Sequence, residues 1–185
     1  MLNRFYTFVG GNSGPWRVSD MRTITGHGMD AVSHLQIVND DLQQAPPNAT
    51  WALRGVVSNQ RYTTRTELDS LKAVQPMLGR PEATCAVLIP ITKSAAWWEL
   101  AQDERREIIE ARSAHIATGI RYLPAVARRL HHSRDIGEPF DFVTWFEFAP
   151  SDTASFYELV SMLRKTEEWR YVEREVEVRL TLDQK

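Results

Sequence analysis

Residues 171–182 constrain the fold of this chain most, because their hydrophobic pattern has a period of two. Two sets of side chains alternate along this segment: Val172, Val176, Val178, Leu180 and Leu182 on one face, and Tyr171, Glu173, Glu175, Glu177, Arg179 and Thr181 on the other. This alternation is typical of a β-strand with one face on a hydrophobic core, and it does not fit a helix. The chain therefore ends in a strand that needs a sheet beside it.

The residues before this strand predict the rest of that sheet. We expect strands over 83–91, 121–132 and 140–149, and helices over 103–118 and 152–166. The second helix carries apolar residues at helical spacing, namely Phe156, Leu159, Val160 and Leu163. Together with the last strand the order is βαββαβ, the ferredoxin-like unit. Residues 83–185 are therefore predicted to form a C-terminal ferredoxin-like half.

The first 82 residues show a weaker version of the same pattern. We expect strands over 3–9, 16–25 and 50–58, and helices over 29–44 and 64–78. The second of these helices should begin at Thr64, because Glu67 three residues later completes a capping box. The predicted fold class is α+β, of the dimeric α+β barrel type. Residues 1–82 would form a truncated N-terminal ferredoxin-like half, and the two antiparallel sheets would pack together in one structural unit.

Composition excludes several classes of function. The net charge of −2, with no basic tail or stripe, gives no support for nucleic-acid binding. Cys85 is the only cysteine, so the chain has no disulfide framework, no zinc knuckle and no CxxCH motif for covalent haem attachment. No apolar run reaches membrane-spanning length, and the N-terminus lacks the features of a signal peptide. We expect a cytoplasmic protein that binds neither membrane nor nucleic acid.

His115 is the first candidate functional residue. It lies on the apolar stripe of the predicted 103–118 helix, one turn after Ala111 and two turns after Ile108. Such a histidine, taken alone, is more often a core residue with satisfied hydrogen bonds than a ligand. No second histidine stands at zinc-binding spacing on this helix, which argues against a structural zinc site. A single helical imidazole facing a flat cofactor is the arrangement that haem proteins use.

Three further charged residues have two interpretations each. Alternation places Arg128 on the apolar face of its strand, where it either pairs at the sheet edge or holds an anion in a closed pocket. Glu168 is either one exposed acid in a charged run or the acceptor for the second N–H of a ligating imidazole. Lys93 is either solvated or the cation that neutralises Glu168.

In their order and spacing, these residues resemble the chlorite dismutase family. The matching elements are Lys93 in PITKS, the Trp97–Trp98 pair, His115 in EARSAHI, Arg128 in AVARRL, Glu168 in KTEEWRYVEREVEVRL and the SNQRYT segment from Ser58 to Thr63. The resemblance covers nearly the whole chain. It is greatest to the short branch of the family, in which the N-terminal half is truncated and homodimers are usual.

The resemblance implies a role for each candidate residue. His115 would be the proximal ligand of a haem b, Glu168 would accept the Nδ1 hydrogen of His115, and Lys93 would hydrogen-bond to Glu168. Arg128 would be the distal arginine. Asn59, Tyr62 and Trp97 would lie near the propionates or the haem edge. Gln75 would reach Arg128 over the distal pocket. Separately from the resemblance, Trp145 and Trp169 look exposed in the sequence, and we expect them to line a dimer interface.

The resemblance also implies a reaction, the conversion of chlorite to chloride and dioxygen. Arg128 would retain the hypochlorite intermediate by position and charge, without acting as an acid or base. The alternatives on the same scaffold are a coproheme decarboxylase-like enzyme, whose branch typically lacks a distal arginine, and a peroxidase-like enzyme, for which we identify no distal acid. The alternative from another class is a non-catalytic haem-binding dimer.

Overall fold

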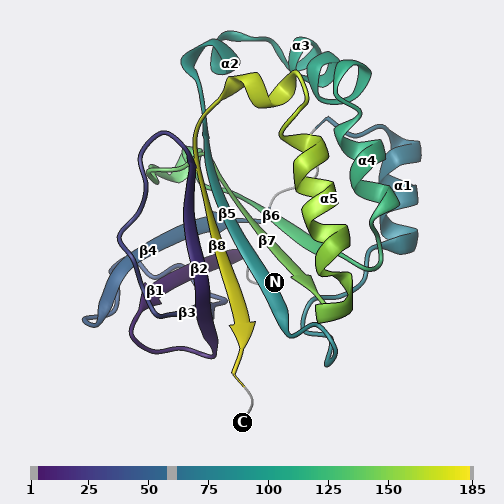
Figure 1. The fold of residues 1–185 in the computed structure, drawn as a ribbon. Helices are drawn as coiled ribbons and strands as arrows, with labels where there is room; N and C mark the ends of the chain where they lie inside the picture. The colour runs from purple at the N-terminus through teal and green to yellow at the C-terminus, as the bar shows by residue number, and fades with distance from the viewer. Residues whose placement is uncertain (1–3, 58–61, 184–185) are drawn as a thin grey trace.

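Eight antiparallel strands close into a barrel in the computed structural model, which describes residues 4–57 and 62–183 (Figure 1). The strands are β1 (Phe5–Gly11), β2 (Trp16–Thr25), β3 (His34–Val38), β4 (Ala49–Val56), β5 (Cys85–Lys93), β6 (Ala127–His132), β7 (Phe142–Phe148) and β8 (Val172–Leu182). Around the barrel their order is β1-β3-β2-β8-β5-β7-β6-β4.

The barrel consists of two sheets with the same internal order. In the second half β8, β5, β7 and β6 lie side by side, and in the first half β4, β1, β3 and β2 do. Each set has the order fourth, first, third, second. The sheets join edge to edge where β2 pairs with β8 and where Val56 of β4 pairs with His132 of β6. The predicted α+β barrel is confirmed, whereas the division between residues 82 and 83 stays a prediction.

The helices lie outside the barrel. They are α1 (Arg65–Val74), α2 (Ala95–Glu99), α3 (Gln102–Arg106), a π-helix (Glu107–Arg112), α4 (His115–Arg121), α5 (Thr153–Leu163) and three 3₁₀ turns (Arg134–Ile136, Pro150–Asp152, Glu168–Tyr171). Helices α1, α4 and α5 stand along the wall formed by the second half, and α2 and α3 lie at one end of the barrel (Figure 1). The first half has no helix between its strands, which is what truncates it.

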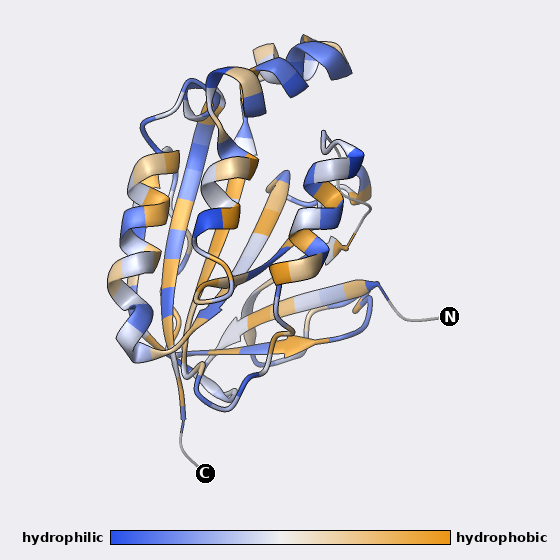
Figure 2. Ribbon diagram, turned by 90° about the vertical axis from the view of Figure 1, so that its right-hand side faces the viewer, coloured by the Kyte–Doolittle hydropathy of each residue, from blue (hydrophilic) through white to orange (hydrophobic). Residues whose placement is uncertain are grey.

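Two hydrophobic clusters lie on opposite faces of this wall. The barrel interior is filled from both halves by residues such as Phe8, Leu35, Leu88, Trp145 and Val178. A second cluster packs the outer face of β5 and β7 against α5, through residues such as Val87, Phe146, Phe156 and Leu159. Hydrophobic positions alternate along the strands and recur on the helices (Figure 2). Trp145 is 1% exposed inside the barrel, so its predicted place at a subunit interface is wrong.

The predicted helix over 29–44 is wrong, because this segment contains strand β3. Leu35 is fully buried and pairs with Gly10 of β1 and Trp16 of β2. A short segment rich in β-branched residues, such as Ile37 and Val38, gains more from completing the sheet than from a helix that has no surface to pack on. Strand β6 is also shorter than predicted, because α4 continues to Arg121 and Tyr122 accepts a turn hydrogen bond from Val126.

Helix α1 confirms the predicted capping box, with reciprocal bonds between Thr64 and Glu67. It ends at Val74, before Pro76. Within the described residues, no helix is long and apolar enough to cross a membrane.

Candidate functional site

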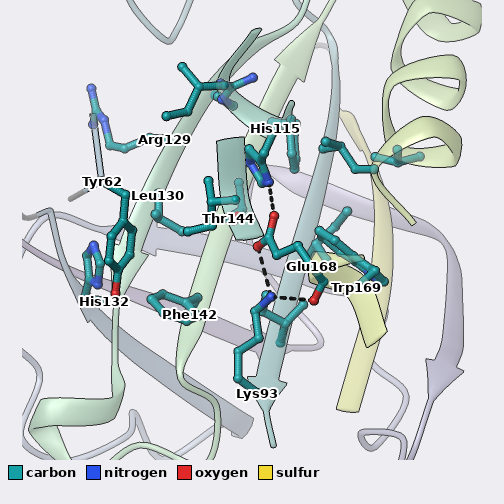
Figure 3. Close-up of a pocket in the computed structure, with 18 of the residues that line it drawn as sticks. Tyr62, Lys93, His115, Arg129, Leu130, His132, Phe142, Thr144, Glu168 and Trp169 are labelled. Atoms are coloured by element: carbon teal, nitrogen blue, oxygen red, sulfur yellow. Dashed lines mark hydrogen bonds and ion pairs between the residues drawn. The ribbon is translucent and has the colours of Figure 1, made fainter. Parts of the chain in front are cut away.

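A cavity of about 340 Å³ lies between the outer face of β5, β6 and β7 and the helices α1, α4 and α5. Much of its wall is apolar, including Ile89, Ile91, Ile116, Leu130, Phe142 and Val160. Of the predicted site residues, the structure brings Lys93, His115, Arg128, Glu168, Tyr62, Trp97 and Gln75 to this one cavity. Asn59 lies outside the described residues. The close-up in Figure 3 shows His115, Glu168 and Lys93 in sequence along one wall.

A break in the helix orients His115. The predicted helix over 103–118 is three pieces, α3, the π-helix and α4, and Ala114 between the last two has a φ of 48°, in the left-handed region. The carboxylate of Glu110 caps the new start by accepting from the backbone N–H groups of Ile116 (2.8 Å) and Ala117 (3.3 Å). His115 is therefore the first residue of α4, and its ring faces the cavity from a rigidly capped end.

A buried carboxylate holds the His115 ring. His115 Nδ1 lies 2.5 Å from Glu168 Oε2, and Lys93 Nζ donates to Glu168 Oε1 at 2.9 Å. Burial alone would raise the pKa of Glu168, but the positive charges of His115 and Lys93 and their hydrogen bonds outweigh it and lower this pKa to about 2. An ionised carboxylate only accepts hydrogen bonds, so Nδ1 carries the hydrogen. Nε2 is then the ring nitrogen that a metal would bind.

The carboxylate is itself fixed by its surroundings. Glu168 is 5% exposed and Lys93 is 3% exposed. The backbone N–H of Glu168 donates to Ser113 Oγ at 3.0 Å, which ties the 3₁₀ turn to the residue two before His115. Asp141 Oδ2 accepts from the backbone N–H of Lys93 at 2.7 Å and holds the end of β5. These hydrogen bonds therefore fix the His115 ring, the Glu168 carboxylate and the Lys93 ammonium relative to one another.

Replacing Glu168 with glutamine should lower the free energy of unfolding by about 3 kcal/mol at pH 7, because the pKa of this carboxyl is about 4.5 in an unfolded chain and about 2 here. The contribution is complete above pH 4.5 and is lost as the pH falls from 4.5 to 2, since only the unfolded chain takes up the proton there. Urea unfolding at several pH values measures this difference. The neighbouring Glu167→Gln, whose side chain is one-third exposed, is the matched control. Equal pH profiles for Glu168→Gln and the unaltered protein would contradict the assignment.

Trp97 has a buried hydrogen-bond donor without an acceptor. The residue is 2% exposed, and within the described part of the chain Nε1 has no partner. Lys93 Nζ lies 4.5 Å from the ring centroid. A buried donor without an acceptor costs free energy, so this N–H is a candidate donor to a polar group of a ligand in the cavity that Trp97 lines.

Arg105 connects Tyr62 with the Trp97–Trp98 pair through hydrogen bonds. The sequence analysis did not identify Arg105 as a site residue. Arg105 donates to the carbonyl oxygens of Trp97 (3.0 Å) and Trp98 (2.7 Å) and to the hydroxyl of Tyr62 (3.4 Å). Tyr62 has a φ of 65°, which is uncommon for a residue with a side chain, and Arg106 donates to its carbonyl oxygen. This edge of the cavity is therefore built from residues that are far apart in the sequence.

Arg128 reaches the cavity from β6. Its backbone pairs with Phe146 of β7, and its carbonyl oxygen accepts from Gln75 Nε2 at 2.8 Å. Gln75 thus contacts Arg128 through the backbone. Among residues 4–57 and 62–183 no carboxylate pairs with the guanidinium. Burial lowers the pKa of Arg128 to about 10, which leaves it protonated at neutral pH. The result is a cation able to bind an anion in the cavity.

An ion network behind the cavity was missed, because Glu175 and Glu177 lie on the polar face of the last strand. Both are fully buried. Arg164 of α5 donates to both carboxylates at 2.6 Å, and Trp169 Nε1 donates to Glu175 at 2.8 Å. Trp169 and Glu175 line the cavity, and the Trp169 ring centroid lies 5.5 Å from Lys93 Nζ. The place of Trp169 at a subunit interface stays a prediction. The sequence did contain a signal for this network: Arg164 stands near the end of an amphipathic helix, and Glu175 and Glu177 follow on the next strand.

Comparisons with known proteins identify relatives of this chain. The family model described as chlorite dismutase matches residues 24–182. The crystal structure of dimeric chlorite dismutase from Nitrobacter winogradskyi has 53% sequence identity and a TM-score of 0.91, and the alignment covers 96% of this chain and 99% of that one. A tryptophan variant of the enzyme from Candidatus Nitrospira defluvii has a TM-score of 0.71 at 18% identity over 99% of this chain and 92% of that one, which supports the fold alone.

A curated relative matches over a shorter stretch. The chlorite dismutase of Ideonella dechloratans is 34% identical over 86 residues, which are 46% of this chain and 28% of that protein. The match thus spans little more than a quarter of the length of that relative.

Proposed function

The chain belongs to the chlorite dismutase family, and from this premise we propose that it is a haem b enzyme that decomposes chlorite to chloride and dioxygen. The observation that carries the proposal is the position of two groups on one cavity. His115 is held on its Nδ1 side by the buried Glu168–Lys93 pair, and Arg128 supplies a cation with no carboxylate partner in the described residues.

The residues around the cavity fit a haem. With its Nδ1 bonded to Glu168, His115 has Nε2 to offer to the iron, and the apolar wall suits the porphyrin face. Trp97 and Tyr62 line the cavity, and we propose that the Trp97 N–H, which has no partner among the described residues, and the Tyr62 hydroxyl contact the propionate carboxylates at the haem edge. We propose His115 as the axial ligand, Glu168 and Lys93 as its supports, and Tyr62, Trp97 and Asn59 as cofactor-binding residues.

Each residue has a distinct task in the proposed reaction. The bound haem iron supplies the redox chemistry that cleaves a chlorine–oxygen bond of chlorite. The negative charge of Glu168 makes the His115 imidazole a stronger donor. Arg128 attracts the chlorite anion and then retains the hypochlorite fragment until its oxygen is transferred and chloride leaves. Gln75 Nε2 donates to the backbone carbonyl oxygen of Arg128 and so holds the backbone of Arg128 in place. One chlorite yields one chloride and one dioxygen, so no external electron donor is needed.

An oxygen electrode tests the proposal. Purified protein loaded with haem should evolve one dioxygen for each chlorite consumed, with chloride as the only chlorine product. Loaded protein that shows a Soret band but evolves no oxygen would overturn dismutation and favour a decarboxylase-like or carrier function. Failure to retain haem at all would overturn every haem-based function.

We also propose that the chain forms a homodimer. The support is its 53% identity, over nearly the full length of both chains, to the Nitrobacter protein that is described as dimeric. Sedimentation equilibrium should give the mass of two chains at micromolar concentration, and the mass of one chain would contradict the proposal.

A further inference from the structure

The guanidinium of Arg128 lies against the one glycine of helix α4. Gly119 is buried, and a Cβ built on it would be 2.2 Å from Arg128 Nη1, 2.3 Å from Nη2 and 2.6 Å from Cζ. No real contact is that short, so the space that any other residue would fill at this position is filled by the arginine head. The atoms concerned are the far end of a flexible side chain, which is able to move.

Glycine is costly at this position for reasons that do not involve Arg128. It stands inside α4, at the fifth of seven residues, with helical neighbours on both sides. A glycine in a helix interior is less stable than alanine because its backbone loses more freedom. Its φ is not positive, so the backbone conformation here does not demand glycine. The close approach of the guanidinium therefore gives a reason for glycine at this position.

The helix connects this glycine to the ligand. Gly119 follows His115 by four residues, so both lie on the same face of α4, and His115 lines the cavity. The start of the same helix is fixed by the Glu110 cap. A rigid helix of seven residues thus sets the position of the His115 ring and, one turn later, the place where the Arg128 head comes to rest.

We propose that Gly119 is a positioning residue that seats the guanidinium of Arg128 at a set distance from the His115 ring. The inference rests on the proposed function of Arg128, because it states how the anion-binding cation is placed. The backbone of Arg128 is held by β7 and Gln75, so the seat on α4 determines where the flexible end of the side chain points. Any larger residue at position 119 would push the head out of its seat and change its distance from the His115 ring.

Gly119→Ala is the direct test, because it adds one methyl group at the seat. The catalytic efficiency with chlorite should fall roughly ten- to hundredfold, since a displacement of about 1 Å of a positioned group has effects of this size. The melting temperature should stay the same or rise, because alanine favours the helix. Phenylglyoxal labelling of Arg128, measured by mass spectrometry with and without haem, should increase, because the displaced head is more accessible.

Two matched variants separate the seat from other effects. Ala117→Gly changes an exposed position of the same helix and alters helix propensity in the opposite direction without touching Arg128, so its efficiency should match that of the unaltered protein. In an Arg128→Ala background, Gly119→Ala should cause no further loss of efficiency, because there is no head left to displace.

The outcomes decide between distinct conclusions. An equal loss of efficiency from Gly119→Ala in both backgrounds, or unchanged labelling together with unchanged efficiency, would overturn the proposal. A Gly119→Ala protein that folds only in the Arg128→Ala background would support it, and one that folds in neither would overturn it. If the unaltered protein evolves no oxygen from chlorite, the proposed function fails, whereas labelling and melting still decide whether Gly119 seats Arg128.

Discussion

Replacing His115 with alanine should raise the dissociation constant for haem by more than about 100-fold, because loss of an outer partner of a metal ligand already costs 10- to 100-fold. The variant removes the imidazole that the Glu168–Lys93 pair holds at the cavity wall. Titration with haemin, followed by the Soret band and by tryptophan fluorescence, measures the change. Added imidazole should restore part of the Soret band, since Glu168 would still hold its N–H.

The matched control for this variant is a second histidine on the same cavity. His132 lies on β6, and its ring packs edge-on against Phe142 at 5.2 Å. His132→Ala should retain haem, because the buried Glu168–Lys93 pair holds the ring of His115 and not that of His132. If His132→Ala lost the Soret band while His115→Ala kept it, the axial ligand would be His132 and the arrangement proposed here would be wrong.

The pattern of the last strand was enough to predict the sheet of the second half but not what covers its polar face. The alternation of residues 171–182 correctly predicted a strand, and Val176, Val178 and Leu180 face the barrel interior. The opposite face was read only as polar. Glu175 and Glu177 are buried there because Arg164 comes from α5 to neutralise them. Charge pairing across separate elements leaves no periodic signal in either element.

The sequence likewise predicted only part of the position of His115. Its place on an apolar stripe was visible, but a continuous helix over 103–118 would have directed the ring differently. The break at Ala114 and the cap from Glu110 reset the helix, and neither contains the glycine or proline that usually indicates a helix end. The partnership of His115 with Glu168, 53 residues later, came from the family resemblance and not from local pattern.

Arg128→Ala should leave haem binding unchanged and reduce the catalytic efficiency with chlorite roughly ten- to hundredfold, the value of one charge-assisted interaction with an anion. It should also shorten the lifetime of the enzyme during turnover, because hypochlorite that is no longer retained diffuses away and oxidises the protein. Oxygen traces at several chlorite concentrations give both quantities, and a hypochlorite trap such as monochlorodimedone detects the escaping fragment. More chlorinated trap per dioxygen is the expected signature.

The neighbouring arginine makes the experiment specific. Arg129 has the same charge and the same strand, but its Nη1 donates to the Tyr6 hydroxyl at 2.9 Å and its guanidinium lies 5.2 Å from the Tyr6 ring centroid. Arg129→Ala should therefore leave turnover and lifetime close to those of the unaltered protein. Arg128→Lys keeps a positive charge but loses the planar fork of donors, so it should bind chlorite yet release more hypochlorite than the unaltered protein. Equal lifetimes for Arg128→Ala and the unaltered protein would show that Arg128 does not retain hypochlorite, because loss of retention should inactivate the enzyme faster.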